Sequence, residues 1–198
     1  NQIGQTDGHQ IDCLEDIGKE LNNQELQLWK MTNGYALVSV EGLLSINKQI
    51  GSFTTDQREA LKGKLKVGIQ WNTEVTLNDN KQLVSQIYCS ALPVAYSSIE
   101  SYYWENFARI VLEATYEATL YTAMNNLKNN KSNSAFLTLV GGGAFGNDLD
   151  WILESLFKAL EKFRHIPLEV NIVSYGRTND ILKQEIANFN NILPPNES

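Results

Sequence analysis

The sequence predicts an α/β fold with a partly parallel sheet. Two observations support this prediction. The apolar run 135–140 has the length and composition of a strand buried on both faces, and a glycine-rich turn and a helical pattern follow it. Helical and strand patterns also alternate along the chain, which is typical of helices packed on a parallel sheet.

The expected elements follow from periodicity and from turn and capping signals. Thr54 and Gln57 form a capping-box pattern at the start of a helix, and Asn33-Gly34 marks a turn. The segment 35–40 fits either a strand or the start of a helix, and this choice stays open. We expect helices at 11–21, 24–30, 40–50, 54–65, 104–127, 147–163 and 180–189, and strands at 66–71, 84–92, 135–140 and 168–175.

Composition and charge limit the class of protein. The 198 residues fit one domain, and a net charge of −7 argues against a nucleic-acid scaffold. No apolar run approaches the roughly 20 residues that a membrane span needs. Cys13 and Cys89 stand alone and are expected as buried free thiols in a reducing, cytoplasmic compartment. Two histidines exclude a His-rich metal site, and we expect no cofactor and a monomer.

The glycine-rich stretch is the first candidate binding site. It consists of Gly141, Gly142, Gly143, Ala144, Phe145, Gly146 and Asn147. A strand, a glycine turn and a helix start hold phosphate well, because glycine lets the backbone approach and the free N–H groups favour an anion. Asn147 is expected to cap the helix, with Asp148 and Asp150 in its first turn. A purely structural turn is the alternative.

The same glycines also fit a second ligand class. The spacing of Gly141, Gly143 and Gly146 satisfies the loose dinucleotide-binding pattern, so an NAD-dependent oxidoreductase is a further hypothesis. Against it, that fingerprint usually opens the first strand–helix–strand unit, and here it falls in the last third of the chain.

The N-terminal segment 1–12 is polar and punctuated by glycine, which predicts a loop. Gln10 and Asp12 stand where this loop meets the helix expected over 11–21. An acidic first helical turn is the plainer interpretation of Asp12. The first residue is Asn rather than Met, and we expect the chain to be a piece of a longer protein.

Residues 140–147 resemble the second phosphate loop of macrodomains, in which a turn with glycines and an aromatic residue wraps the diphosphate of ADP-ribose. Gly143, Ala144, Phe145 and Gly146 match that turn. The resemblance implies a three-layer sandwich with a mixed, partly parallel sheet. It implies one ADP-ribose-binding domain over residues 1–190, with a tail over 191–198 and further strands upstream of residue 1.

The N-terminal segment resembles the poly(ADP-ribose) glycohydrolases. Their motif is a glycine-rich loop followed by Gln-Glu-Glu at a helix start, and Gln10-Ile11-Asp12 stands at that place. Asp12 takes the place of the catalytic glutamate, and Gly4 and Gln5 lie in the loop. The triple glycine is missing, and Ile11 replaces an acid.

Most of residues 1–190 resemble the macrodomain-like ADP-ribosyl hydrolases, for example over 68–76, 89–96 and 137–147. This resemblance implies removal of ADP-ribose from a protein side chain, arginine above all, with ubiquitin among the modified targets. Asp12, Asp7 and Gln10 are then the catalytic candidates. The resemblance implies ADP-ribose or an ADP-ribosylated protein as the partner. It implies a cytoplasmic location, which is the host cytosol for members that are secreted effectors. A module that binds ADP-ribose without cleaving it is the alternative.

Overall fold

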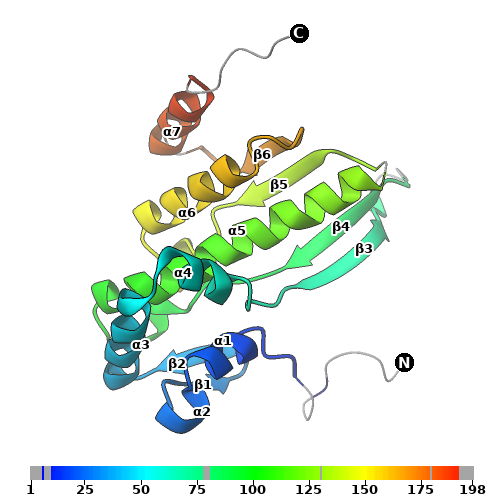
Figure 1. Cartoon of the computed structure of the whole chain (residues 1–198). Coiled ribbons are helices and arrows are strands. Elements are labelled where there is room, and N and C mark those ends of the chain that lie inside the picture. The colour runs from blue at the N-terminus through cyan, green and yellow to red at the C-terminus, as the bar shows by residue number, and fades with distance from the viewer. Residues whose placement is uncertain (1–5, 7–9, 78–80, 130, 179, 192–198) are drawn as a thin grey trace.

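The computed structural model describes residues 6, 10–77, 81–129, 131–178 and 180–191, and it confirms the α/β class (Figure 1). The helices are α1 (Glu15–Glu20), α2 (Asn23–Leu26), α3 (Val40–Ser52), α4 (Thr55–Lys62), α5 (Glu105–Lys128), α6 (Leu149–Lys162) and α7 (Asp180–Asn191). The strands are β1 (Trp29–Thr32), β2 (Tyr35–Val38), β3 (Gly68–Glu74), β4 (Leu83–Tyr88), β5 (Ser134–Thr138) and β6 (Glu169–Val173).

Local signals in the sequence place several element ends. The capping box at Thr54 is confirmed, since its side chain accepts the N–H of Gln57 and the Gln57 side chain accepts the N–H of Thr54. Asn33 and Gly34 join β1 to β2 with φ values of 50° and 82°. Two positive φ angles match the twist of a tight hairpin, so the segment left open from residue 35 begins as a strand.

Near the N-terminus, two predicted helices are shorter than expected. The helix expected over 11–21 begins only at Glu15, because the Asp12 side chain accepts the N–H of Leu14 and holds a turn ahead of it. The helix expected over 24–30 ends at Leu26, and Trp29 already belongs to β1. Asn23 fixes that strand start, since its side-chain amide bonds both the N–H and the C=O of Trp29.

The parallel pairing predicted from the sequence is found between β5 and β6. Ser134 lies opposite Glu169 and Thr138 opposite Val173, with α6 forming the crossover. The other two ladders, β1–β2 and β3–β4, are antiparallel, and an irregularity interrupts β3–β4 between Gln70 and Thr73. The described strands therefore form three separate two-stranded sheets rather than one mixed sheet.

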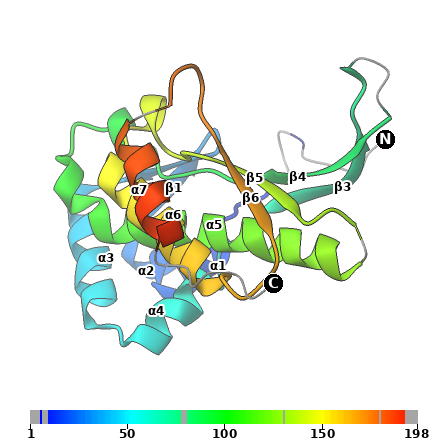
Figure 2. The same ribbon diagram turned by 90° about the horizontal axis from the view of Figure 1, so that it is seen from above.

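Helix α5 is the centre of the core. It runs along both β4 and β5 and packs against α3, α4 and α6 (Figures 1 and 2). The sequence predicts a helix buried on two sides, and the structure confirms this, with Tyr121 the large side chain that stays half exposed. The fully buried hydrophobic side chains of α5 are Phe107, Ala108, Ile110, Val111, Leu112, Tyr116 and Leu120.

The bonds of α5 show that β4 and β5 run in the same direction. Asn126, near the end of α5, donates to Ser85 in β4, and Thr115, near the middle of α5, donates to the C=O of Ser90 just after β4. Tyr116 donates to the C=O of Thr138 at the end of β5. The carboxyl ends of β4 and β5 therefore lie next to the same part of α5.

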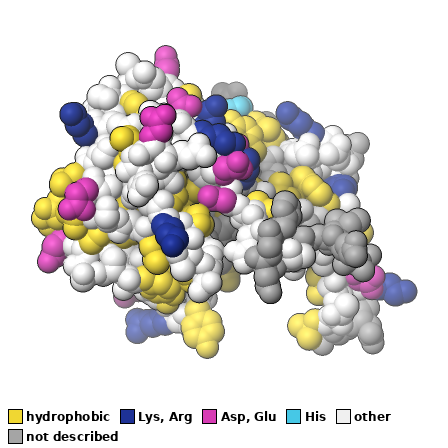
Figure 3. Space-filling view, turned by 90° about the horizontal axis from the view of Figure 1, so that it is seen from below, with side chains coloured by type: hydrophobic (Ala, Val, Ile, Leu, Met, Phe, Trp, Pro, Cys, Tyr) yellow, Lys and Arg dark blue, Asp and Glu magenta, His cyan; other side chains and the backbone are white. Residues whose placement is uncertain are grey.

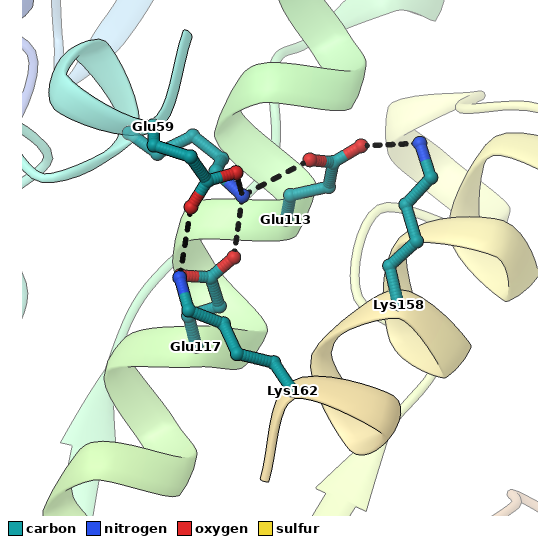
Figure 4. A network of polar contacts seen from close by, with 6 residues as sticks. Glu59, Glu113, Glu117, Lys158 and Lys162 are labelled. Atoms are coloured by element: carbon teal, nitrogen blue, oxygen red, sulfur yellow. Dashed lines mark hydrogen bonds and ion pairs between the residues drawn. The ribbon is translucent and has the colours of Figure 1, made fainter. Parts of the chain in front are cut away.

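A network of charged side chains joins α4, α5 and α6 (Figure 4). Lys62 of α4 is 7% exposed, and its Nζ lies 2.5 Å from Glu117, 2.5 Å from Glu59 and 3.3 Å from Glu113. Lys158 and Lys162 of α6 contact the same three carboxylates from the other side. Each buried charge therefore has a partner of opposite sign, as burial requires.

The pKa values in this network follow from its pairing. Burial by itself lowers the pKa of Lys62, but hydrogen bonds to Glu117 and Glu59 outweigh it and hold that pKa above its ordinary value. Burial by itself raises the pKa of Glu59, and the hydrogen bonds from Lys162 and Lys62 outweigh it and lower that pKa.

Truncating Lys62 tests whether this network stabilises the packing of the three helices. Lys62→Ala leaves Glu113 and Glu117 buried without their central cation, and we expect a loss of about 3–5 kcal/mol in the free energy of unfolding. Lys158→Ala is the matched control, because Lys158 is 60% exposed and its loss costs about 1 kcal/mol or less. Urea unfolding measures both, and equal losses would contradict a special role for Lys62.

The network also predicts how stability depends on pH. Because the folded-state pKa of Glu59 is lowered, its ion pairs contribute stability above its unfolded value, and this contribution is lost as the pH falls through the folded value. Glu59→Gln removes the titrating group. The difference in stability between wild type and this variant is therefore expected to shrink from pH 6 toward acid, as measured by thermal melting across that range. A constant difference would argue against the pairing.

Candidate functional site

The glycine turn after β5 has the backbone that its composition predicts. Gly141, Gly143 and Gly146 have φ angles of 86°, 64° and 68°, values that side chains with a Cβ rarely adopt. Residues 143–145 form one short 3-10 turn, and three residues separate it from the start of α6 at Leu149.

Two of these glycines are also required by packing. A Cβ at Gly141 would lie 2.6 Å from the Cβ of Ala91, and a Cβ at Gly146 would lie 2.6 Å from the Cβ of Ala95. The turn therefore sits directly on the segment that follows β4. A Cβ at Gly143 would meet no atom within 4 Å, so only the backbone angle explains this glycine locally.

The prediction that Asn147 caps α6 is wrong. The helix begins at Leu149 with Asp148 as its N-cap residue, and no side chain bonds the helix start. The Asn147 side chain is buried instead and donates to the C=O groups of Leu92 and Gly141. These two hydrogen bonds link the glycine turn to the segment after β4. They also give the two carbonyl groups the donor that burial requires.

The exposed tip of the turn offers unpaired backbone donors. The N–H groups of Gly143 and Ala144 find no acceptor among the described residues, and both residues are exposed. Such consecutive N–H groups form an anion-binding concavity. Asp148 and Asp150 are exposed, so their charges are solvated rather than buried beside the turn.

An aromatic cluster borders the turn. The ring of Phe145 stacks on Tyr96, with centroids 5.6 Å apart and planes 22° apart, and Tyr35 packs against both rings at 5.1 Å and 6.1 Å. Tyr35 comes from the start of β2 and Tyr96 from the segment after β4. Neither tyrosine was predicted from the sequence, because the hairpin signal Asn33-Gly34 just before Tyr35 gives no sign of this contact.

A cavity of about 340 Å³ opens beside this cluster. Residues 11–14, 31, 34–36 and 88–93 form most of its wall, and Leu65, Lys66, Val111 and Thr115 complete it. Tyr35 belongs to both the cavity wall and the aromatic cluster. The cavity and the glycine turn each follow the carboxyl end of a strand, β4 for the cavity and β5 for the turn.

Asp12 lines the cavity and is half-buried. Its Oδ1 accepts the N–H of Leu14 at 2.8 Å, so this oxygen serves the local turn. The other carboxylate oxygen has no hydrogen bond to another described residue. Of the remaining catalytic candidates, Gln10 is exposed and does not line the cavity, whereas Asp7 lies outside the described residues, as do Gly4 and Gln5.

Lys66 brings positive charge to the cavity. Its Nζ lies 2.9 Å from Asp16 and 3.2 Å from Glu15 in α1. The hydrogen bonds from Lys66 and Lys19 lower the pKa of Asp16 to about 2, so this carboxylate stays ionised across the physiological range. The face seen from below carries acidic and basic side chains next to one another (Figure 3).

Cys13 and Cys89 both line the cavity and are free. The structure makes them partly rather than fully buried. Burial raises the pKa of each thiol above its ordinary value, most directly at Cys89. Since the thiolate is the nucleophile, these cysteines are poor nucleophiles at neutral pH.

Within the described ranges, no group of three or more His, Cys, Asp or Glu side chains is arranged to hold a metal ion. No helix in those ranges has the length and apolar character needed to cross a membrane. Comparisons with protein-family models, curated proteins and solved structures found no match to this chain.

Single alanine substitutions distinguish Gly143, which only its backbone angle requires, from Gly146, which close packing also requires. Gly143→Ala is expected to cost about 1–2 kcal/mol, because only its positive φ penalises a Cβ. Gly146→Ala is expected to cost more, because the new Cβ also collides with Ala95. Urea unfolding of the two variants measures the difference. Equal losses would contradict the close packing of the turn on segment 91–95.

Proposed function

We propose that the protein is a hydrolase that removes ADP-ribose from a modified protein side chain, arginine above all. One observation carries this proposal. A cavity that contains Asp12 meets, through Tyr35, the glycine turn with its exposed N–H groups. A ligand with a diphosphate at one end and a sugar at the other matches such a site.

The turn would hold the diphosphate. The free N–H groups of Gly143 and Ala144 supply donors for phosphate oxygens, and no side chain at Gly143 blocks their approach. The cavity volume of about 340 Å³ lies within the usual range of small-molecule sites, about 300–1,000 Å³. The aromatic cluster between them offers ring faces to the sugar or to the base.

Asp12 would act on the glycosidic bond. Breaking that bond develops positive charge on the sugar, and a nearby carboxylate stabilises it or activates a water. The Asp12 oxygen that Leu14 does not occupy is available for this role. The leaving side chain would be a guanidinium, in keeping with the arginine linkage that the resemblance implies.

One observation favours the alternative of a module that binds ADP-ribose without cleaving it. The hydrogen bond from Leu14 to Asp12 gives this residue a structural task that needs no catalysis. Both alternatives would use the same cavity and turn, so only turnover separates them. The finer fold assignment, a macrodomain-like three-layer sandwich in a cytosolic protein, is part of the same proposal.

Asp12→Asn is the variant that separates catalysis from structure. The asparagine Oδ1 still accepts the N–H of Leu14, so we expect unchanged stability and unchanged ADP-ribose binding. A carboxylate in acid–base catalysis contributes about 10²–10⁴-fold, and turnover of an arginine-linked ADP-ribosyl peptide is expected to fall by that factor. Released ADP-ribose and thermal melting, measured on one preparation, test both expectations.

The binding part of this experiment compares how much ADP-ribose and NADH each raise the thermal stability of the protein. ADP-ribose at about 100 times its dissociation constant is expected to add about 2.7 kcal/mol to the stability. No shift with ADP-ribose would contradict the proposal, and a larger shift with NADH would favour the oxidoreductase. Binding without turnover by the wild-type chain on arginine-linked and serine-linked substrates would assign the binding module.

A further inference from the structure

A groove of about 370 Å³ lies between α6 and α7, which are neighbours in space (Figures 1 and 2). Phe157 of α6 packs on Phe189 of α7 with ring centroids 5.5 Å apart. Along the described residues of α7, Leu182 is the one that is fully buried. The rest of α7 therefore covers its neighbour only in part, and the groove remains between the two helices.

Four apolar side chains line this groove. Leu153 and Phe157 lie one turn apart on α6, and Ile181 and Phe189 lie on α7. Ile181 is 55% exposed, although it borders a groove with other apolar residues. Covering this apolar surface would stabilise a complex, because its removal from water is favourable.

The charged side chains that line the groove are all acidic. Asp150 and Glu154 lie one turn apart on α6, and Glu185 lies on α7. The lining contains no lysine, arginine or histidine. Glu154 is paired with Arg109 of α5 at 2.7 Å, whereas Asp150 and Glu185 are exposed and have no ion pair within the described ranges. Two carboxylates beside an apolar surface thus lack a cation.

The sign of this charge limits what can bind in the groove. Nucleic acids and anionic membrane surfaces carry the same sign and would be repelled. A second copy of the chain, which has a net charge of −7, would place the same carboxylates opposite one another across a two-fold axis. The occupant therefore combines positive charge with apolar side chains.

We propose that this groove docks a segment of a partner protein in which apolar residues are flanked by Lys or Arg. The apolar side chains contact Leu153, Phe157 and Ile181, and the cations pair with Asp150 and Glu185 at the rim. The groove volume lies near the lower end of the usual range for small-molecule sites, about 300–1,000 Å³, so it accepts a few side chains rather than a folded surface. The groove shares no lining residue with the cavity that contains Asp12, and this docking does not depend on the proposed hydrolase activity.

Fluorescence anisotropy of labelled peptides tests the chemistry of the occupant. The probe peptide has two leucines with two arginines on each side, and the control peptide has serines in place of the leucines. We expect the leucine peptide to bind, and its affinity to fall with added salt because exposed ion pairs are screened. The serine peptide is expected to bind about tenfold more weakly, because it buries no comparable apolar surface. Equal affinity of the two peptides would show attraction by charge alone and would overturn the proposal.

Substitution of the two unpaired carboxylates tests the place of binding. Asp150→Asn combined with Glu185→Gln is expected to weaken binding of the leucine peptide about tenfold, since two exposed ion pairs are lost. The matched control combines Asp56→Asn with Glu20→Gln. It removes two exposed carboxylates outside the groove, and Asp56 lies in the first turn of α4 as Asp150 does in α6. Equal weakening by the two double variants would contradict docking between α6 and α7.

Ile181→Ser tests the apolar part of the same groove. Because Ile181 is 55% exposed, this substitution leaves the core intact, which urea unfolding checks. The smaller, polar side chain removes apolar contact with the peptide, and we expect binding about threefold weaker or more. Unchanged affinity of this variant for the leucine peptide would overturn the burial of an apolar side chain between the two helices.

Discussion

The packing of the three helices depends on one buried ammonium group. Lys62 of α4 is stable in its position only because Glu59, Glu113 and Glu117 surround it, and the two lysines of α6 complete the balance of charge. A buried ion pair adds little stability over an apolar pair, but it tolerates few alternative arrangements. We therefore expect the network to set the register of α4 and α6 on α5 more than it deepens the core.

Helix α5 in turn holds the strand ends next to the candidate site. The Tyr116 hydroxyl donates to the C=O of Thr138 and accepts the N–H of Val140, which fixes the end of β5 just before the glycine turn. Burial raises the pKa of Tyr116, so the hydroxyl stays protonated and keeps its donor role. The neighbouring Thr115 donates to the C=O of Ser90, just after β4. One helical turn thus holds both sides of the candidate site.

Much of the fold was accessible from the sequence because its signals are local. The capping box at Thr54, the turn at Asn33-Gly34 and the strand–glycine–helix order around Gly141 each depend on a few adjacent residues. The errors have a different origin. Asn147 has the side chain of a helix cap, but the carbonyl of Leu92, 55 residues away in the chain, competes for its amide.

The candidate site was predicted only in part for the same reason. Phe145 belongs to a recognisable turn, whereas Tyr35 and Tyr96 join it through contacts between segments far apart in the sequence. Asp12 lines the cavity, and its bond to Leu14 was not visible in the sequence pattern. The ADP-ribosyl hydrolase activity itself stays a prediction.

The contact between Gly146 and Ala95 has a consequence for how this sequence can change over time. The two positions share a space that holds a single methyl group, since a second Cβ would come within 2.6 Å of the first. A larger residue at either position has to be matched by a change in the spacing of the two segments. Positions 95 and 146 are therefore expected to vary together or not at all, and their joint restriction would reflect steric fit even where no ligand is bound.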